Sequence, residues 1–139
     1  MSPSLVVLGA GGAIETAERG NTALALHAGA SAVLIDCPGA VAQKLRRAGI
    51  DALALEALVI THGHPDHLAG LPSLIHNLWM LHRTVPLPVF APGEDLPRIE
   101  RLLEIFNLVR RAAFLDPRPL PRSPASLFFD WPGGGRLHS

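Results

Sequence analysis

Short apolar runs, separated by glycine, proline and polar residues, set the pattern of this chain. Short continuous runs predict buried strands, at 5–8, 22–28, 32–35, 58–61 and 87–91. The second and third runs flank Gly29-Ala30-Ser31, which favours a hairpin. Apolar residues that recur every three or four positions predict helices, at 40–48, 73–82 and from Asp95 onward. Because strands alternate with helices, we expect an α/β fold.

The pattern changes after Asp116. Five prolines and the run Gly133-Gly134-Gly135 crowd the last segment, which predicts a tail over 117–139 that is loop or disordered, with one brief strand at Leu127 to Phe129. The preceding residues, 1–116, are expected to form one domain. A chain of 139 residues with 48% hydrophobic residues has enough apolar material for such a core.

Composition excludes some classes of protein. The net charge is zero, with 12 basic and 12 acidic side chains, so there is no global attraction to nucleic acid or anionic membrane. A single cysteine, Cys37, rules out an internal disulfide, and the apolar run near the N-terminus is too short for a membrane span or a signal peptide. We therefore expect a soluble, cytoplasmic protein without a membrane partner. A local basic cluster offers either contacts for RNA phosphate or an ordinary solvated helix face: Arg98, Arg101, Arg110 and Arg111.

The candidate chemistry lies in one segment, 61–67, with the sequence Thr-His-Gly-His-Pro-Asp-His. Imidazole nitrogen and carboxylate oxygen suit zinc and similar divalent metals. Residues two apart in an extended loop point the same way, so His62 and His64 can reach one ion. Asp66 and His67 follow where the chain turns toward a helix, so they can serve a second ion. A closed structural zinc site is disfavoured because such sites are usually rich in cysteine.

This motif resembles the His-X-His-X-Asp-His hallmark of the metallo-β-lactamase superfamily. Further segments are similar to its ribonuclease Z-like branch, at 8–12, 20–22, 34–37, 68–72 and 87–92. The resemblance covers about residues 5 to 110. It implies the N-terminal half of an αββα sandwich, with one mixed β-sheet and flanking helices.

The resemblance also implies a site for two Zn²⁺ ions, with Mn²⁺ or Fe²⁺ as alternatives. His62 and His64 would bind the first ion, and Asp66 and His67 the second. Asp66 would in addition be catalytic, because it would hold the attacking hydroxide or receive its proton. The implied reaction is hydrolysis of a phosphodiester by a metal-activated hydroxide, with RNA as the substrate.

The resemblance implies that a complete site needs further metal ligands downstream of the motif. The candidates for them in this sequence are poor: Asp116, Asp130 and His138. A truncated, non-catalytic remnant that binds metal therefore stays open as one alternative. Because the basic cluster is modest for an RNA-binding groove, a hydrolase of small esters, thioesters or lactams stays open as another. A lone half-sandwich would leave one apolar sheet face without cover. We therefore expect either a homo-oligomer or a second half supplied by a complementing chain.

Overall fold

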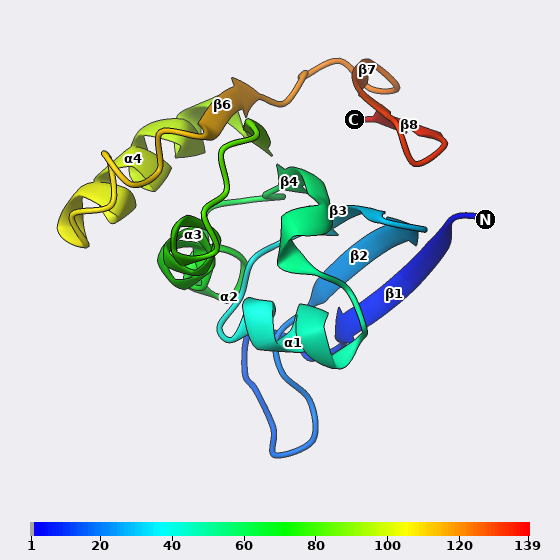
Figure 1. The fold of residues 1–139 in the computed structure, drawn as a ribbon, viewed down its shortest axis with the longest axis horizontal. Helices are drawn as coiled ribbons and strands as arrows, with labels where there is room; N and C mark the ends of the chain where they lie inside the picture. The colour runs from blue at the N-terminus through cyan, green and yellow to red at the C-terminus, as the bar shows by residue number, and fades with distance from the viewer. Residues whose placement is uncertain (1) are drawn as a thin grey trace.

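One mixed six-stranded sheet forms the centre of the protein. The computed structural model describes residues 2–139. The strand order is the chain order: β1 (Ser4–Gly9), β2 (Ala23–Ala28), β3 (Ser31–Ile35), β4 (Leu55–Val59), β5 (Leu87–Ala91) and β6 (Leu115–Pro119). The strands β1 to β3 pair antiparallel, whereas β3 to β6 pair parallel (Figure 1). This arrangement confirms the predicted α/β class.

Helices cover one face of this sheet. They are α1 (Val41–Arg47), α2 (Pro65–Leu68), α3 (Leu71–Met80) and α4 (Leu96–Ile105), with 3₁₀ turns η1 (Ala52–Ala54) and η2 (Gly93–Asp95). The main core lies between these helices and the strands, and leucines such as Leu34, Leu45 and Leu74 are fully buried there. Among the described residues, none of the helices has the length and hydropathy that a membrane span requires.

The segment 117–139 is more ordered than its proline and glycine content predicts. After β6 it forms a hairpin of β7 (Leu127–Trp131) and β8 (Gly135–His138). The brief strand expected near Leu127 is therefore present, but it has a partner, and β6 extends across the expected boundary at residue 116. Figure 1 shows the hairpin on the other side of the sheet from α1 and α3.

The hairpin covers part of the second sheet face. Its Trp131 is 3% exposed and packs with Val33, Val59 and Phe90 in a second, smaller apolar cluster. The indole Nε1 donates a 2.7 Å hydrogen bond to the Ser31 hydroxyl. The expectation of a fully uncovered face was therefore wrong over β3 to β5. At the edge strand β1, Leu5 and Val7 are each 58% exposed, so the apolar face stays open at that end.

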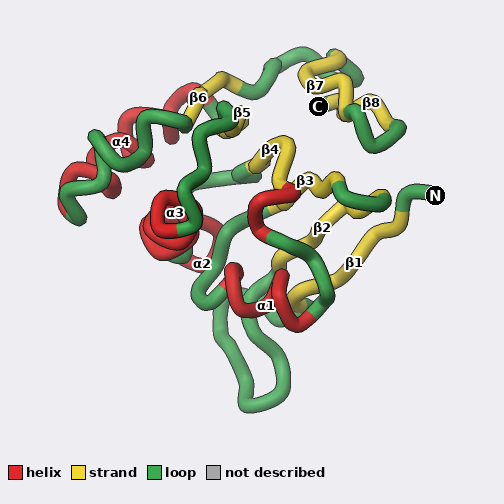
Figure 2. The backbone as a smooth tube through the Cα atoms, in the orientation of Figure 1, coloured by secondary structure: helices red, strands yellow, loops and turns green. Residues whose placement is uncertain are grey.

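The loops at one edge of the sheet carry the sequence motifs. Figure 2 shows a long loop between β1 and β2, and shorter loops that follow β3 and β4. The parallel pairing of β3 and β4 brings the carboxyl ends of these two strands side by side. Functional residues of open α/β sheets usually lie at this edge, and the histidine motif follows β4 directly.

Candidate metal centre

The motif 61–67 occupies the turn between β4 and α2. The backbone N–H of Ile60 donates to the Phe90 carbonyl, at 2.7 Å, and so fixes the end of β4 against β5. Pro65 then begins α2, with His64 in extended conformation at its N-cap. Since proline has no N–H to lose and a preset φ, it is well suited to this first helical position. The motif thus changes from strand to helix within a few residues.

A buried carboxylate organises the motif from the neighbouring strand. Asp36 follows β3, is 3% exposed and has φ of 63°. Its carboxylate accepts hydrogen bonds from the Thr61 N–H at 2.7 Å and from the Thr61 hydroxyl at 2.9 and 3.0 Å. Its Oδ2 also lies 2.7 Å from Nδ1 of His67. Strained backbone at such a position is typical of functional sites, and here it aims one carboxylate at both ends of the motif.

The contact with Asp36 orients the imidazole ring of His67. A carboxylate next to Nδ1 favours a proton on that atom and holds the ring in one orientation. His67 Nε2 lies 3.1 Å from Oδ2 of Asp66. The two predicted ligands of the second ion are therefore adjacent, and the Asp36–His67 pair is of the kind that supports a metal-binding imidazole.

The other histidines gather at the same place. The ring centroids of His62 and His64 are 4.7 Å apart, and those of His62 and His67 are 3.9 Å apart. The Thr61 hydroxyl lies 3.1 Å from His62 Nδ1, so Asp36 also acts on this ring through Thr61. The three imidazole rings of the motif therefore lie close to one another.

The fit to a divalent cation is incomplete. Within residues 2–139, no group of three or more histidine, cysteine, aspartate or glutamate side chains is arranged to hold a metal ion. Both ring nitrogens of His67 instead face carboxylates, those of Asp36 and Asp66. The donors therefore suit zinc in chemical type, but the described residues do not arrange them around one ion.

Backbone contacts attach the motif to the loop after β3. The Cys37 N–H donates to the His67 carbonyl at 2.7 Å, and the Gly70 N–H donates to the Cys37 carbonyl at 2.8 Å. A Cβ on Gly70 would collide with the Pro38 carbonyl, so this close approach requires glycine. Burial, with a smaller effect of the Asp36 charge, raises the pKa of the Cys37 thiol. Cys37 is therefore a protonated core residue and not a nucleophile.

The other candidate ligands do not join the motif. Asp116 and Asp130 lie next to arginines of their own segments. His138 lies on β8, with Nδ1 3.0 Å from the Ala125 carbonyl oxygen, and it lines a cavity of about 480 Å³ that Thr61 also lines. The sequence reasoning did not find Asp36; the one available signal was a carboxylate placed directly after a buried strand.

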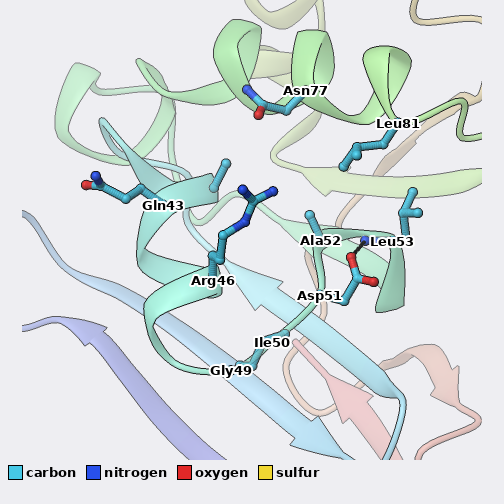
Figure 3. Close-up of a pocket in the computed structure, with 10 residues that line it drawn as sticks. Gln43, Arg46, Gly49, Ile50, Asp51, Ala52, Leu53, Asn77 and Leu81 are labelled. Carbon is cyan, nitrogen blue, oxygen red and sulfur yellow. Dashed lines mark hydrogen bonds between the residues drawn. The ribbon is translucent and has the colours of Figure 1, made fainter.

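Cavities lie both near the motif and away from it. A groove of about 520 Å³ separates Gly63 and Pro65 from Leu102 of α4. Another cavity, of about 550 Å³, lies between α1, η1 and α3 (Figure 3) and has Arg46 and Asn77 among its lining residues. Because η1 precedes β4 whereas the motif follows it, the cavity in Figure 3 is at the opposite end of that strand and is separate from the candidate centre.

Comparisons with known proteins agree with this geometry. A ribonuclease Z of Mycobacterium bovis strain BCG is 31% identical over 106 residues, which cover 74% of this chain and 38% of that protein. The chain thus spans little more than a third of this relative. The crystal structure of the short form of human tRNase Z has a TM-score of 0.68 at 26% identity, with coverage of 76% of this chain and 41% of that one.

A second solved structure supports the fold alone. The metallo-β-lactamase fold protein YhfI from Bacillus subtilis has a TM-score of 0.73 at 21% identity. The match covers 94% of this chain and 49% of the YhfI chain.

A family model described as Anti-Pycsar protein Apyc1 matches residues 3–92, which is more than half of the chain. The chain therefore belongs to the family described as Anti-Pycsar protein Apyc1, with the fold of the ribonuclease Z-like branch of the metallo-β-lactamase superfamily.

Proposed function

We propose that this chain carries the first part of a metal-dependent phosphodiester hydrolase site of the ribonuclease Z type. The observation that carries the proposal is the buried Asp36 carboxylate, which orients His67 and, through Thr61, His62. A buried charge is costly unless it is well paired, and within residues 2–139 the Asp36 carboxylate is paired only with the motif. Such an arrangement is expected where imidazoles must hold a fixed direction toward a cation.

The motif residues divide into two pairs in this proposal. His62 and His64 hold one Zn²⁺, whereas Asp66 and His67 hold the other; Mn²⁺ and Fe²⁺ are the alternatives. When bound, the ions supply Lewis-acid polarisation of a phosphoryl oxygen and a water of lowered pKa. As the resemblance to the metallo-β-lactamase superfamily implies, Asp66 would also orient the attacking water and accept its proton.

The proposed substrate is RNA, because relatives of this chain are named ribonuclease Z. The basic residues give this choice little support of their own: Arg111 lies over the Trp79 ring and Arg98 contacts the motif backbone. Hydrolysis of small esters, thioesters or lactams by the same residues therefore remains the enzymatic alternative.

A non-catalytic role is the second candidate, and one observation favours it. The described residues 2–139 lack a group of three or more potential ligands in metal-binding geometry. Catalysis then requires further ligands from outside residues 2–139. Without them, the motif binds a cation weakly and does not turn over substrate.

Turnover of bis(p-nitrophenyl) phosphate by the purified chain, loaded with Zn²⁺ or Mn²⁺, tests the proposal. We expect activity that EDTA abolishes and that His64→Ala lowers by at least about a hundredfold, as for the loss of a main catalytic group. His76→Ala is the matched control, because His76 lies exposed on α3 outside the motif. Metal-loaded protein without turnover would favour the non-catalytic role.

A further inference from the structure

An ion pair at the start of α4 lies against the middle of the motif. Asp95 has a side chain that is only 8% exposed, and its Oδ1 lies 2.8 Å from Nη1 of Arg98. The same nitrogen donates a 3.2 Å hydrogen bond to the carbonyl oxygen of Gly63. The pair therefore joins α4 to the peptide between His62 and His64.

This pair occupies the space that a side chain at residue 63 would take. A Cβ on Gly63 would collide with Oδ1 of Asp95 and with Nη1 of Arg98. The φ of Gly63 lies outside the left-handed region, so its backbone conformation is open to other residues. A side chain at residue 63 would therefore require the Asp95 and Arg98 side chains to shift, whereas the turn itself does not demand glycine.

An aspartate directly before a helix commonly caps its N-terminus, and Asp95 directly precedes α4. In the structure it stands at the N-cap position of α4 but makes no side-chain capping hydrogen bond. Its carboxylate is instead directed at Arg98. An ordinary surface ion pair one helical turn apart contributes little to stability. The burial of Asp95 and the additional bond to the Gly63 carbonyl distinguish this pair from such a contact.

We propose that Arg98, held by Asp95, is a positioning residue that fixes the peptide between His62 and His64 and so sets the affinity of the motif for a divalent cation. The inference rests on the proposed function for its cation and on the contacts above for its geometry. When the carbonyl between two imidazoles is fixed, both rings start from restricted directions. When it is free, cation binding must first order the loop, and that entropy cost lowers the affinity.

The contact is tested first without metal. We expect Gly63→Ala to lower the Tm by about 5 °C, because the new methyl group must displace the ion pair. In an Asp95→Ala/Arg98→Ala background the methyl group meets neither side chain, so the same substitution is expected to lower the Tm by at most about 2 °C. Equal shifts in the two backgrounds would show that the pair does not constrain residue 63.

The consequence for the cation is tested by Co²⁺ titration of the purified chain, followed by visible absorption, at a temperature where every variant is folded. We expect Arg98→Ala to raise the Co²⁺ dissociation constant about tenfold. Arg98→Lys should recover part of this loss, since lysine keeps the charge but offers a single-point donor. Arg101→Ala, on the same helix and with no bond to Gly63, should leave the dissociation constant unchanged.

Each outcome decides a different claim. Equal Co²⁺ affinity of the Arg98→Ala and Arg101→Ala variants would overturn the positioning role for the cation. If the parent chain binds no Co²⁺, the proposed metal function fails, and the affinity part of the inference fails with it. The Tm comparison at Gly63 uses no metal, so it still decides whether the Asp95–Arg98 pair fixes the loop.

Discussion

Replacement of Trp131 tests whether the C-terminal hairpin is an integral part of this fold. Trp131 is 3% exposed, packs on the second sheet face and donates from Nε1 to the Ser31 hydroxyl. Truncation of a buried aromatic side chain to alanine costs about 3–5 kcal/mol. Part of that loss, about 1 kcal/mol, is the hydrogen bond. For a domain of this size the total corresponds to a fall in Tm of about 10 °C or more.

The matched control is the other tryptophan. Trp79 is 38% exposed, and the guanidinium of Arg111 lies 4.6 Å from its ring centroid, which is a contact worth about 0.5–1 kcal/mol. Urea unfolding of Trp131→Ala and Trp79→Ala, followed by circular dichroism, should therefore show a much larger loss for Trp131. If Trp131→Ala destabilises the protein no more than Trp79→Ala does, the hairpin is not packed as described.

Three further predictions concern the carboxylate, the thiol and the buried guanidinium. Asp36→Asn removes one acceptor from Thr61 or His67. Calorimetry should therefore show a loss of about 1–3 kcal/mol in the free energy of unfolding, and zinc titration should show an affinity about 10- to 100-fold lower. Unchanged stability and zinc affinity would contradict the role of Asp36. Burial raises the pKa of Cys37, so the folded state holds a proton that the unfolded state releases. Stability should therefore decrease above about pH 9 by up to tenfold in the folding constant per pH unit, and Cys37→Ala should flatten this slope. Burial lowers the pKa of Arg83, and its guanidinium donates to four backbone carbonyls. Urea unfolding of Arg83→Met should therefore show a loss of about 2–4 kcal/mol in the free energy of unfolding. Unchanged stability of this variant would contradict a structural role for Arg83.

The alkaline prediction is simplified by the composition of the chain. It has no tyrosine and a single lysine, so few side chains other than Cys37 ionise between about pH 8 and 11. If the stability of Cys37→Ala still decreases with rising pH, that decrease must therefore come from groups other than this thiol. The same experiment should show that a thiol reagent modifies Cys37 only after unfolding, because the side chain is fully buried in the folded state.

The local pattern of residues along the chain was sufficient to predict the histidine motif and most of the strands and helices. Apolar runs predicted β1 to β5 because a strand in this sheet is buried by helices on one face. The histidines were visible because they lie within one short segment. Asp36 was not, since its role depends on the parallel pairing of β3 with β4, which brings together residues 25 positions apart.

The order of the C-terminal hairpin, in contrast, could not be predicted from the local sequence alone. Proline and glycine between 117 and 139 predict loop. Pro124, Pro132, Gly133 and Gly134 do lie in turns, whereas Pro117 and Pro119 lie in β6. What orders the segment is the burial of Trp131 against β3 to β5, which is a tertiary contact with residues far away in sequence. The Asp95–Arg98 pair was missed for a similar reason, because its partner Gly63 is 35 positions away from Arg98.

The zinc content of the purified chain after equilibrium dialysis tests the central claim most directly. The parent protein and a His27→Ala/His76→Ala/His82→Ala variant, which keeps the motif, should each retain at least one Zn²⁺ per chain. The His62→Ala/His64→Ala/His67→Ala variant should retain none while circular dichroism shows it folded. Zinc-free parent protein, or equal zinc in the two triple variants, would contradict a metal centre at this motif.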